Sequence, residues 1–249
     1  MKSSGLTVLS LFLAVSASGA ASLASVEFLG FSIDGKYAAK EQYWIEDGSG
    51  FPRAEITVMS VADNNVIRVF EVHWTEELMY ENGTEMYYEN SMNPARETVL
   101  GNAESCLDSL GISSVYEGVH CVSHPLTDTG ADPENVQFVT WVGSSIWMGP
   151  EFSLNLQNHS EKPDSPPDWL SMFETPVLLE VLITDAGGTE VMHLLDHSYH
   201  PEYRYVSNYR IRDVYVYDDS LTAIILNTTE PGFEGPDSMF RMVTGVISH

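Results

Sequence analysis

Three histidines near one another are the sequence's nearest approach to a metal-binding cluster. His193, His197 and His200 follow in close succession, with Asp196 among them. Two imidazole groups at positions i and i+4 form a zinc-binding face when the segment is helical. Residues 191–195 instead have the pattern of a strand, in which a spacing of four separates two side chains by about 13 Å. We therefore predict no metal site here and interpret the histidines as surface residues.

Two other segments contain the oxygen-bearing side chains that calcium prefers. Residues 47–50 and 128–134 combine aspartate with glycine, as parts of calcium-binding loops do. Neither segment has the full ligand spacing of such a loop, and aspartate with glycine is equally typical of tight turns. The turn interpretation is favoured, with calcium as the alternative and no other cofactor expected.

An internal repeat places two loops rich in glycine and proline at equivalent positions. Residues 30–61 resemble residues 213–247 at a constant offset of 184, which aligns Gly48 with Gly232. If the two copies pack together, both loops emerge at comparable edges and could frame a groove, and exposed loops on a rigid sheet often carry binding residues. The alternative is that both are demanding turns that need glycine at positive φ. The candidate binding residues are Asp47, Ser49, Phe51, Arg204, Phe233, Glu234 and Asp237.

Common catalytic motifs are absent from the sequence. It contains no Gly-x-Ser-x-Gly, no His-Glu-x-x-His and no nucleotide-binding glycine pattern. Its 36 acidic residues make chance carboxylate neighbours inevitable, so they do not identify a glycosidase. The 5 tryptophans and 12 tyrosines could include a platform for stacking sugars, although aromatic residues in β-rich proteins more often lie in the core. We predict no catalytic residue.

The first residues have the pattern of a secretory signal peptide. Lys2 precedes an apolar run at residues 6–15, and the small residues at 18–21 suit cleavage. The run is half the roughly 20 residues that a membrane helix needs, and no later stretch is apolar enough to span a membrane. We expect residues 1–21 to be removed and residues 22–249 to form a single exported domain, in the bacterial periplasm or outside the cell.

Net charge limits the possible partners. The chain carries 36 acidic and 11 basic residues, for a formal charge of −25. Such a chain repels nucleic acid and anionic lipid, so both are poor partners, and we expect no nucleic acid as a partner. Because the acidic residues are spread along the whole chain, we interpret them as a solvated surface, with specific cation binding as the alternative.

The two cysteines, Cys106 and Cys121, predict a disulfide bond in an exported protein. The bond would close a loop of about 15 residues and stabilise the fold by roughly 3 kcal/mol.

Turn signals divide the chain into about twelve strand-like segments and one clear helix. Strands at this density predict a mainly β fold, either an antiparallel sandwich, a barrel or a propeller-like assembly. The helix begins near Asn93 and Pro94 and ends before Gly111. We expect the disulfide bond to connect this helix to the strand at residues 115–122, and the first and last repeat units to lie together. The predicted buried face of the helix consists of Ala95, Val99, Ala103, Cys106 and Leu110.

Several short patterns occur in the same order as in a known family. Residues 31–39 resemble the Phe-Ser-x-Asp-Gly hairpin of Tol-type β-propellers. The chain then contains a helix ending in Leu110-Gly-Ile, the pattern Pro201-x-x-Arg204 and residues 232–237. Together, and in this order, these segments resemble a bacterial family of predicted secreted proteins, a domain of unknown function. The resemblance covers nearly all of the chain after the signal peptide and implies export and a single domain. It transfers no catalytic residue.

We therefore predict an exported, non-catalytic binding or envelope-associated module, with an envelope protein or a saccharide as its partner. The alternatives are a glycosidase-like hydrolase with a carboxylate pair and a calcium-stabilised structural domain.

Overall fold

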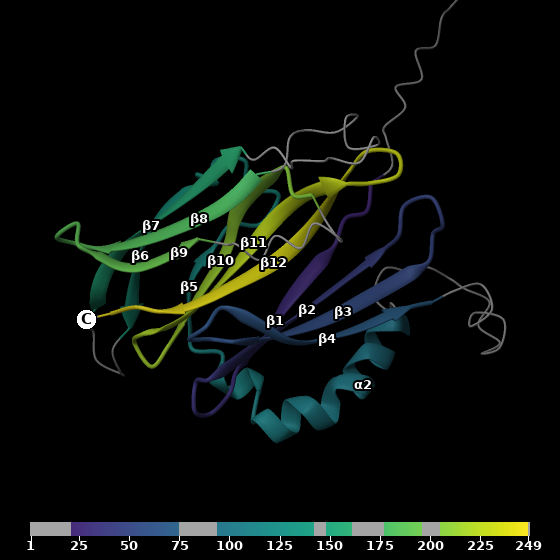
Figure 1. Ribbon diagram of the computed structural model, residues 1–249, viewed down its shortest axis with the longest axis horizontal. Coiled ribbons are helices and arrows are strands. Elements are labelled where there is room, and N and C mark those ends of the chain that lie inside the picture. The colour runs from purple at the N-terminus through teal and green to yellow at the C-terminus, as the bar shows by residue number, and fades with distance from the viewer. Residues whose placement is uncertain (1–20, 75–93, 142–147, 161–176, 196–204, 249) are drawn as a thin grey trace, which may run out of the picture.

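The computed structural model describes residues 21–74, 94–141, 148–160, 177–195 and 205–248, and these residues form three antiparallel sheets and one long helix (Figure 1). Sheet 1 has the order β1 (Ser25–Phe31), β2 (Tyr37–Ile45), β3 (Pro52–Ser60), β4 (Asn65–His73). Sheet 2 has the order β12 (Pro236–Val246), β11 (Leu221–Pro231), β10 (Asn208–Tyr217), β5 (Val119–Ser123). Sheet 3 has the order β6 (Asn135–Trp141), β7 (Met148–Ser160), β8 (Val177–Asp185), β9 (Glu190–Leu195). The helices are α2 (Pro94–Leu110) and a short 3₁₀ turn, η1 (Ser114–Tyr116). The mainly β prediction is confirmed, and the described strands form open sheets instead of a closed barrel.

The three sheets pack face to face, with sheet 2 in the middle and α2 on the outer side of sheet 1 (Figure 1). The central position of sheet 2 explains the long apolar run in β11. Ala223 and Ile225 contact sheet 1, whereas Ile224 and Leu226 contact sheet 3, so both faces of this strand are buried. In β8, which belongs to the outer sheet 3, buried and more exposed residues alternate instead.

The predicted internal repeat corresponds to two similar units, β1–β3 and β10–β12, which lie against each other in the fold. The Tyr217 hydroxyl donates to the carbonyl oxygen of Ile33 (3.3 Å), and the Phe240 N–H donates to Oε1 of Gln42 (3.0 Å). Each unit starts with a strand whose pairing register shifts, after Phe28 in β1 and after Ile211 in β10. The prediction that the first and last units are adjacent is therefore confirmed.

Helix α2 has the predicted bounds and is tied to sheet 1 by an arginine. Its buried residues include Ala95, Val99 and Ala103, as the spacing predicted. Arg96 donates from Nε and Nη2 to the two carboxylate oxygens of Glu41 (2.8 and 2.9 Å), whose side chain is fully buried in β2. The same guanidinium pairs with Glu27 of β1.

The predicted disulfide bond is wrong, because Cys106 and Cys121 are both free thiols. Cys106 lies on α2, outside sheet 1. Cys121 lies on β5 and packs against the core between sheets 2 and 3, where its thiol donates to the carbonyl oxygen of Val119 (3.4 Å). The two cysteines belong to different layers, so no covalent bond links the helix to this strand.

We expect two free thiols per chain in the denatured protein without reductant, measured by thiol titration and intact mass. Burial raises the pKa of the Cys121 thiol to about 11, so little thiolate forms at neutral pH. In the native protein, Cys121 should therefore be alkylated far more slowly than after denaturation, and the Cys106→Ser variant isolates its signal. A mass two hydrogens lower, with no titratable thiol, would contradict the structure.

Candidate functional site

A cleft of about 270 Å³ opens where β1 of sheet 1 lies beside β5 and β10 of sheet 2. Pockets for small molecules usually measure about 300–1,000 Å³, so this cleft suits a compact ligand. It is lined by Val26, Glu27, Phe28, Glu117, His120, Ser123, Arg212, Asp213, Tyr215 and Ile225.

The polar side of the cleft is a hydrogen-bonded cluster centred on Asp213. Nε2 of His120 lies 2.9 Å from Oδ1 of Asp213, and Nη1 of Arg212 donates to the same oxygen (2.9 Å). Arg212 Nη1 also donates to the Ser123 hydroxyl (3.1 Å). The Asp213 side chain is only 7% exposed, whereas that of His120 is 39% exposed. A buried carboxylate thus holds a more accessible imidazole and a guanidinium in fixed positions.

Strand pairing explains how distant residues reach this cluster. In the β5–β10 ladder, Asp213 pairs with Ser123 and Tyr215 pairs with His120. Consecutive residues of a regular strand point to opposite faces. The register shift after Ile211 breaks this alternation, as a β-bulge does, so both Arg212 and Asp213 contribute to the cleft.

The apolar side of the cleft contains a stack of three rings. Tyr215 lies between Phe28, with centroids 4.3 Å apart and planes at 26°, and His120, at 4.3 Å and 12°. Burial, reinforced by the negative charges of Asp213 and Glu117, raises the pKa of the Tyr215 hydroxyl, so this group stays neutral. Neighbouring rings occupy both faces of Tyr215.

The lining of the cleft is negatively charged. Three carboxylates, of Glu27, Glu117 and Asp213, face one guanidinium, of Arg212, which gives a formal charge of −2 with His120 neutral. Arg96 lies behind Glu27, but it pairs with Glu41 as well and so offsets two carboxylates with one charge. A site of this sign repels anions.

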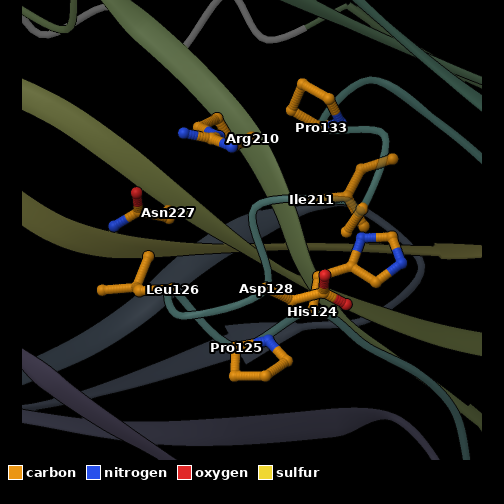
Figure 2. A pocket seen from close by; sticks show the side chains of 9 residues that line it. His124, Pro125, Leu126, Asp128, Pro133, Arg210, Ile211 and Asn227 are labelled. Carbon is orange, nitrogen blue, oxygen red and sulfur yellow. The ribbon is translucent and has the colours of Figure 1, made fainter.

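A second, smaller hollow lies between the loop that follows β5 and strands β10 and β11 (Figure 2). Its volume of about 30 Å³ fits one or two water molecules and excludes a larger ligand. Asp128 in this loop accepts the Gly130 N–H (3.0 Å), and Asp132 accepts the Glu134 N–H (2.9 Å). Both carboxylates therefore serve as turn acceptors, as the turn interpretation of residues 128–134 predicted. The hollow is lined by His124, Pro125, Leu126, Asp128, Ala131, Pro133, Arg210, Ile211 and Asn227.

The structure brings together three of the predicted binding residues of the two repeated loops: Asp47, Phe233 and Glu234. The Glu234 N–H donates to Oδ2 of Asp47 (3.2 Å), and the ring of Phe233 packs on Gly48 while staying 80% exposed. The two loops thus contact each other directly, and Figure 1 shows them at the same end of sheets 1 and 2.

The remaining predicted loop residues have separate roles. Asp237 accepts the Ser22 N–H (2.7 Å), and burial raises the pKa of the Asp237 carboxyl. The Ser49 hydroxyl donates to Glu46 (2.7 Å) and accepts the N–H of Phe51 (3.2 Å). Arg204 lies outside the described residues.

His193, the described member of the histidine group, lies on the exposed side of sheet 3. Its Nε2 is 2.7 Å from one carboxylate oxygen of Glu180, and Nε2 of His159 is 2.5 Å from the other. These side chains pair across three strands, and nowhere in the described parts of the chain do three His, Cys, Asp or Glu gather as metal ligands. His197 and His200 lie outside the described residues.

Comparison with known proteins identifies the family. The sequence model of a family described as "Predicted secreted protein (DUF2259)", a domain of unknown function, matches residues 39–245. The chain belongs to this family. Among curated proteins, none matches the chain. Within the described residues, no helix has the length and apolar character needed to cross a membrane.

The region shared with this family of predicted secreted proteins contains the cleft residues from Glu117 to Ile225, whereas the three cleft residues of β1 precede it. Sequence reasoning did not predict His120, Arg212 or Asp213 as site residues. These residues form no local motif, and only the pairing of β5 with β10 places them together.

Proposed function

We propose that this chain is an exported, non-catalytic binding module whose ligand occupies the cleft between β1 and β5–β10. The observation that carries this proposal is the hydrogen-bonded cluster in the cleft. The buried Asp213 orients His120 and Arg212, and Arg212 also donates to Ser123. Polar groups that are oriented before binding lower the entropic cost of recognition.

We further propose that residues 1–21 are a signal peptide and that residues 22–249 act as one domain in the bacterial periplasm or outside the cell. The layered sheets suit a sandwich-like scaffold better than a propeller, because one sheet is enclosed between the other two. A rigid scaffold of this kind would hold the cleft open without a metal, although calcium at the aspartate-rich turns remains the alternative.

A hydrolase, glycosidase-like in its use of carboxylates, is the second candidate. It is favoured by one observation, that Glu27, Glu117 and Asp213 line the same cleft as an imidazole hydrogen-bonded to a carboxylate. Such a pair is suited to general acid–base chemistry. Hydrolysis of a panel of chromogenic glycosides, lost in the Asp213→Asn variant, would support this candidate over the binding module.

The test is a thermal-shift screen of the mature protein against oligosaccharides, small organic solutes, divalent metals and chelator. We expect one ligand to raise the melting temperature by several degrees in a concentration-dependent way, because a ligand that binds only the native state stabilises it. His120→Ala should abolish this shift, whereas the matched variant His159→Ala, on the outer face of sheet 3, should keep it.

Other outcomes of the same screen would reassign the site. If the ligand-induced rise in melting temperature is retained in His120→Ala but lost in Phe233→Ser, the ligand binds at the two contacting loops. That result would contradict the proposal that it binds in the cleft. A melting temperature lowered by chelator and restored by calcium would support the calcium-stabilised domain.

A further inference from the structure

We infer that the ligand of the cleft is a small amphipathic organic cation, one that carries an ammonium group on a compact apolar body. This inference rests on the proposed binding function and specifies the chemical class of its ligand. Charge, ring geometry and the apolar wall each contribute to it.

The first argument is the charge that remains after internal pairing. Nη1 of Arg212 donates to Asp213 and Ser123, so the positive charge of Arg212 is paired with the buried carboxylate of Asp213. Glu27 shares Arg96 with the buried Glu41. Glu117, half-buried at the cleft, adds a further carboxylate. The cleft therefore offers acceptors and negative potential to an incoming cation, and carboxylates in a partly desolvated cleft attract a cation more strongly than exposed ones do.

The second argument is that the tyrosine cannot act as an open platform. A sugar ring stacks on a free aromatic face. Both faces of Tyr215 are covered, by Phe28 on one side and His120 on the other, each with centroids 4.3 Å away. Stacking of a neutral saccharide on Tyr215 is therefore blocked, although its hydroxyl stays neutral and able to form hydrogen bonds.

The third argument is the apolar wall of the cleft. Val26, Phe28 and Ile225 line the same cleft as Glu117 and Asp213. A bare metal ion would leave this wall unused, and a polyamine would bring a second charged ammonium group against it. A compact apolar body with one ammonium group satisfies both sides of a cleft of about 270 Å³.

The test uses three probes with the same aromatic body and different charge, measured by titration calorimetry on the mature protein near neutral pH. These are 2-phenylethylammonium, its neutral counterpart 2-phenylethanol and the anion 3-phenylpropionate, with glucose as a saccharide. We expect the ammonium to bind at least about tenfold more tightly than the alcohol, the anion not to bind, and the preference to shrink at high salt. Glu117→Gln should weaken ammonium binding about tenfold and leave alcohol binding unchanged.

The control variant is Glu151→Gln, which removes one carboxylate from an exposed position on β7, in sheet 3. If both variants weaken the ammonium equally, the preference reflects only the diffuse charge of the chain, and the inference is overturned. If the alcohol or glucose binds as tightly as the ammonium and His120→Ala abolishes that binding, the cleft is still the binding site. The inference that its ligand is a cation is then wrong. Absence of ammonium binding overturns the inference outright, and the wider screen with His120→Ala then judges the binding function by itself.

Discussion

Replacing Arg96 with alanine should destabilise the protein by about 3 kcal/mol at neutral pH, measured by urea unfolding. The substitution leaves the fully buried Glu41 carboxylate without the two hydrogen bonds that compensate its burial. This cost lies at the lower end of the free-energy range for breaking a buried ion pair, because the Arg96 side chain is itself 27% exposed.

The pH dependence of this effect separates lost charge compensation from lost helix packing. Burial already raises the pKa of Glu41 above its ordinary value of 4.5, and removing Arg96 raises it further. The folded variant then binds a proton that the unfolded chain releases, so the destabilisation is smallest below pH 4.5 and grows as the pH rises through the folded pKa. Adding Glu41→Gln should remove most of this slope.

A matched control is Arg53→Ala, which removes an arginine that also pairs with two glutamates. Because Glu46 and Glu71 are 29% and 46% exposed, water replaces the lost contacts, and the cost should stay below about 1 kcal/mol. Equal losses in the two variants would contradict the role assigned to the burial of Glu41.

Replacing Gly30 with alanine should also cost about 3 kcal/mol or more, because backbone strain and overpacking add. Gly30 has φ +106°, and a Cβ there would lie 2.1 Å from the carbonyl oxygen of Ser113. The obstacle is backbone, so no rotamer change relieves it. Gly30 follows the register shift of β1 that comes after Phe28, and the variant should therefore disturb the cleft as well. Urea unfolding measures the cost, and ligand-induced thermal shift measures the effect on the cleft.

Gly101→Ala is the control for this prediction. Gly101 lies on the exposed side of α2 with open space around the position of a Cβ, so alanine should stabilise the protein by about 0.5–1 kcal/mol. If the Gly30→Ala protein is as stable as wild type, the backbone at Ser113 can move away from β1 at little cost in free energy. That result would contradict this prediction.

Local sequence determined the elements of this fold because each depends on neighbouring residues. The spacing of Ala95, Val99 and Ala103 predicted the buried face of α2, and Gly111 ends the helix at φ +67°. The Asp34-Gly35 pair predicted the first hairpin, where Gly35 has φ +69°. The offset of 184 also predicted that the first and last units lie together, because two copies of one unit share the same apolar faces.

The layers and the cleft depended on tertiary structure. Counting cysteines predicted a bond between Cys106 and Cys121, but nothing local indicates that one lies outside sheet 1 and the other beside the core between sheets 2 and 3. His120 and Asp213 are 93 residues apart and meet only because β5 joins the edge of β10. In a chain with 36 acidic residues, composition cannot single out Asp213 as a carboxylate that is buried beside a histidine. Propensities and turns act over a few residues, whereas pairing of distant strands decides which charges share a cleft.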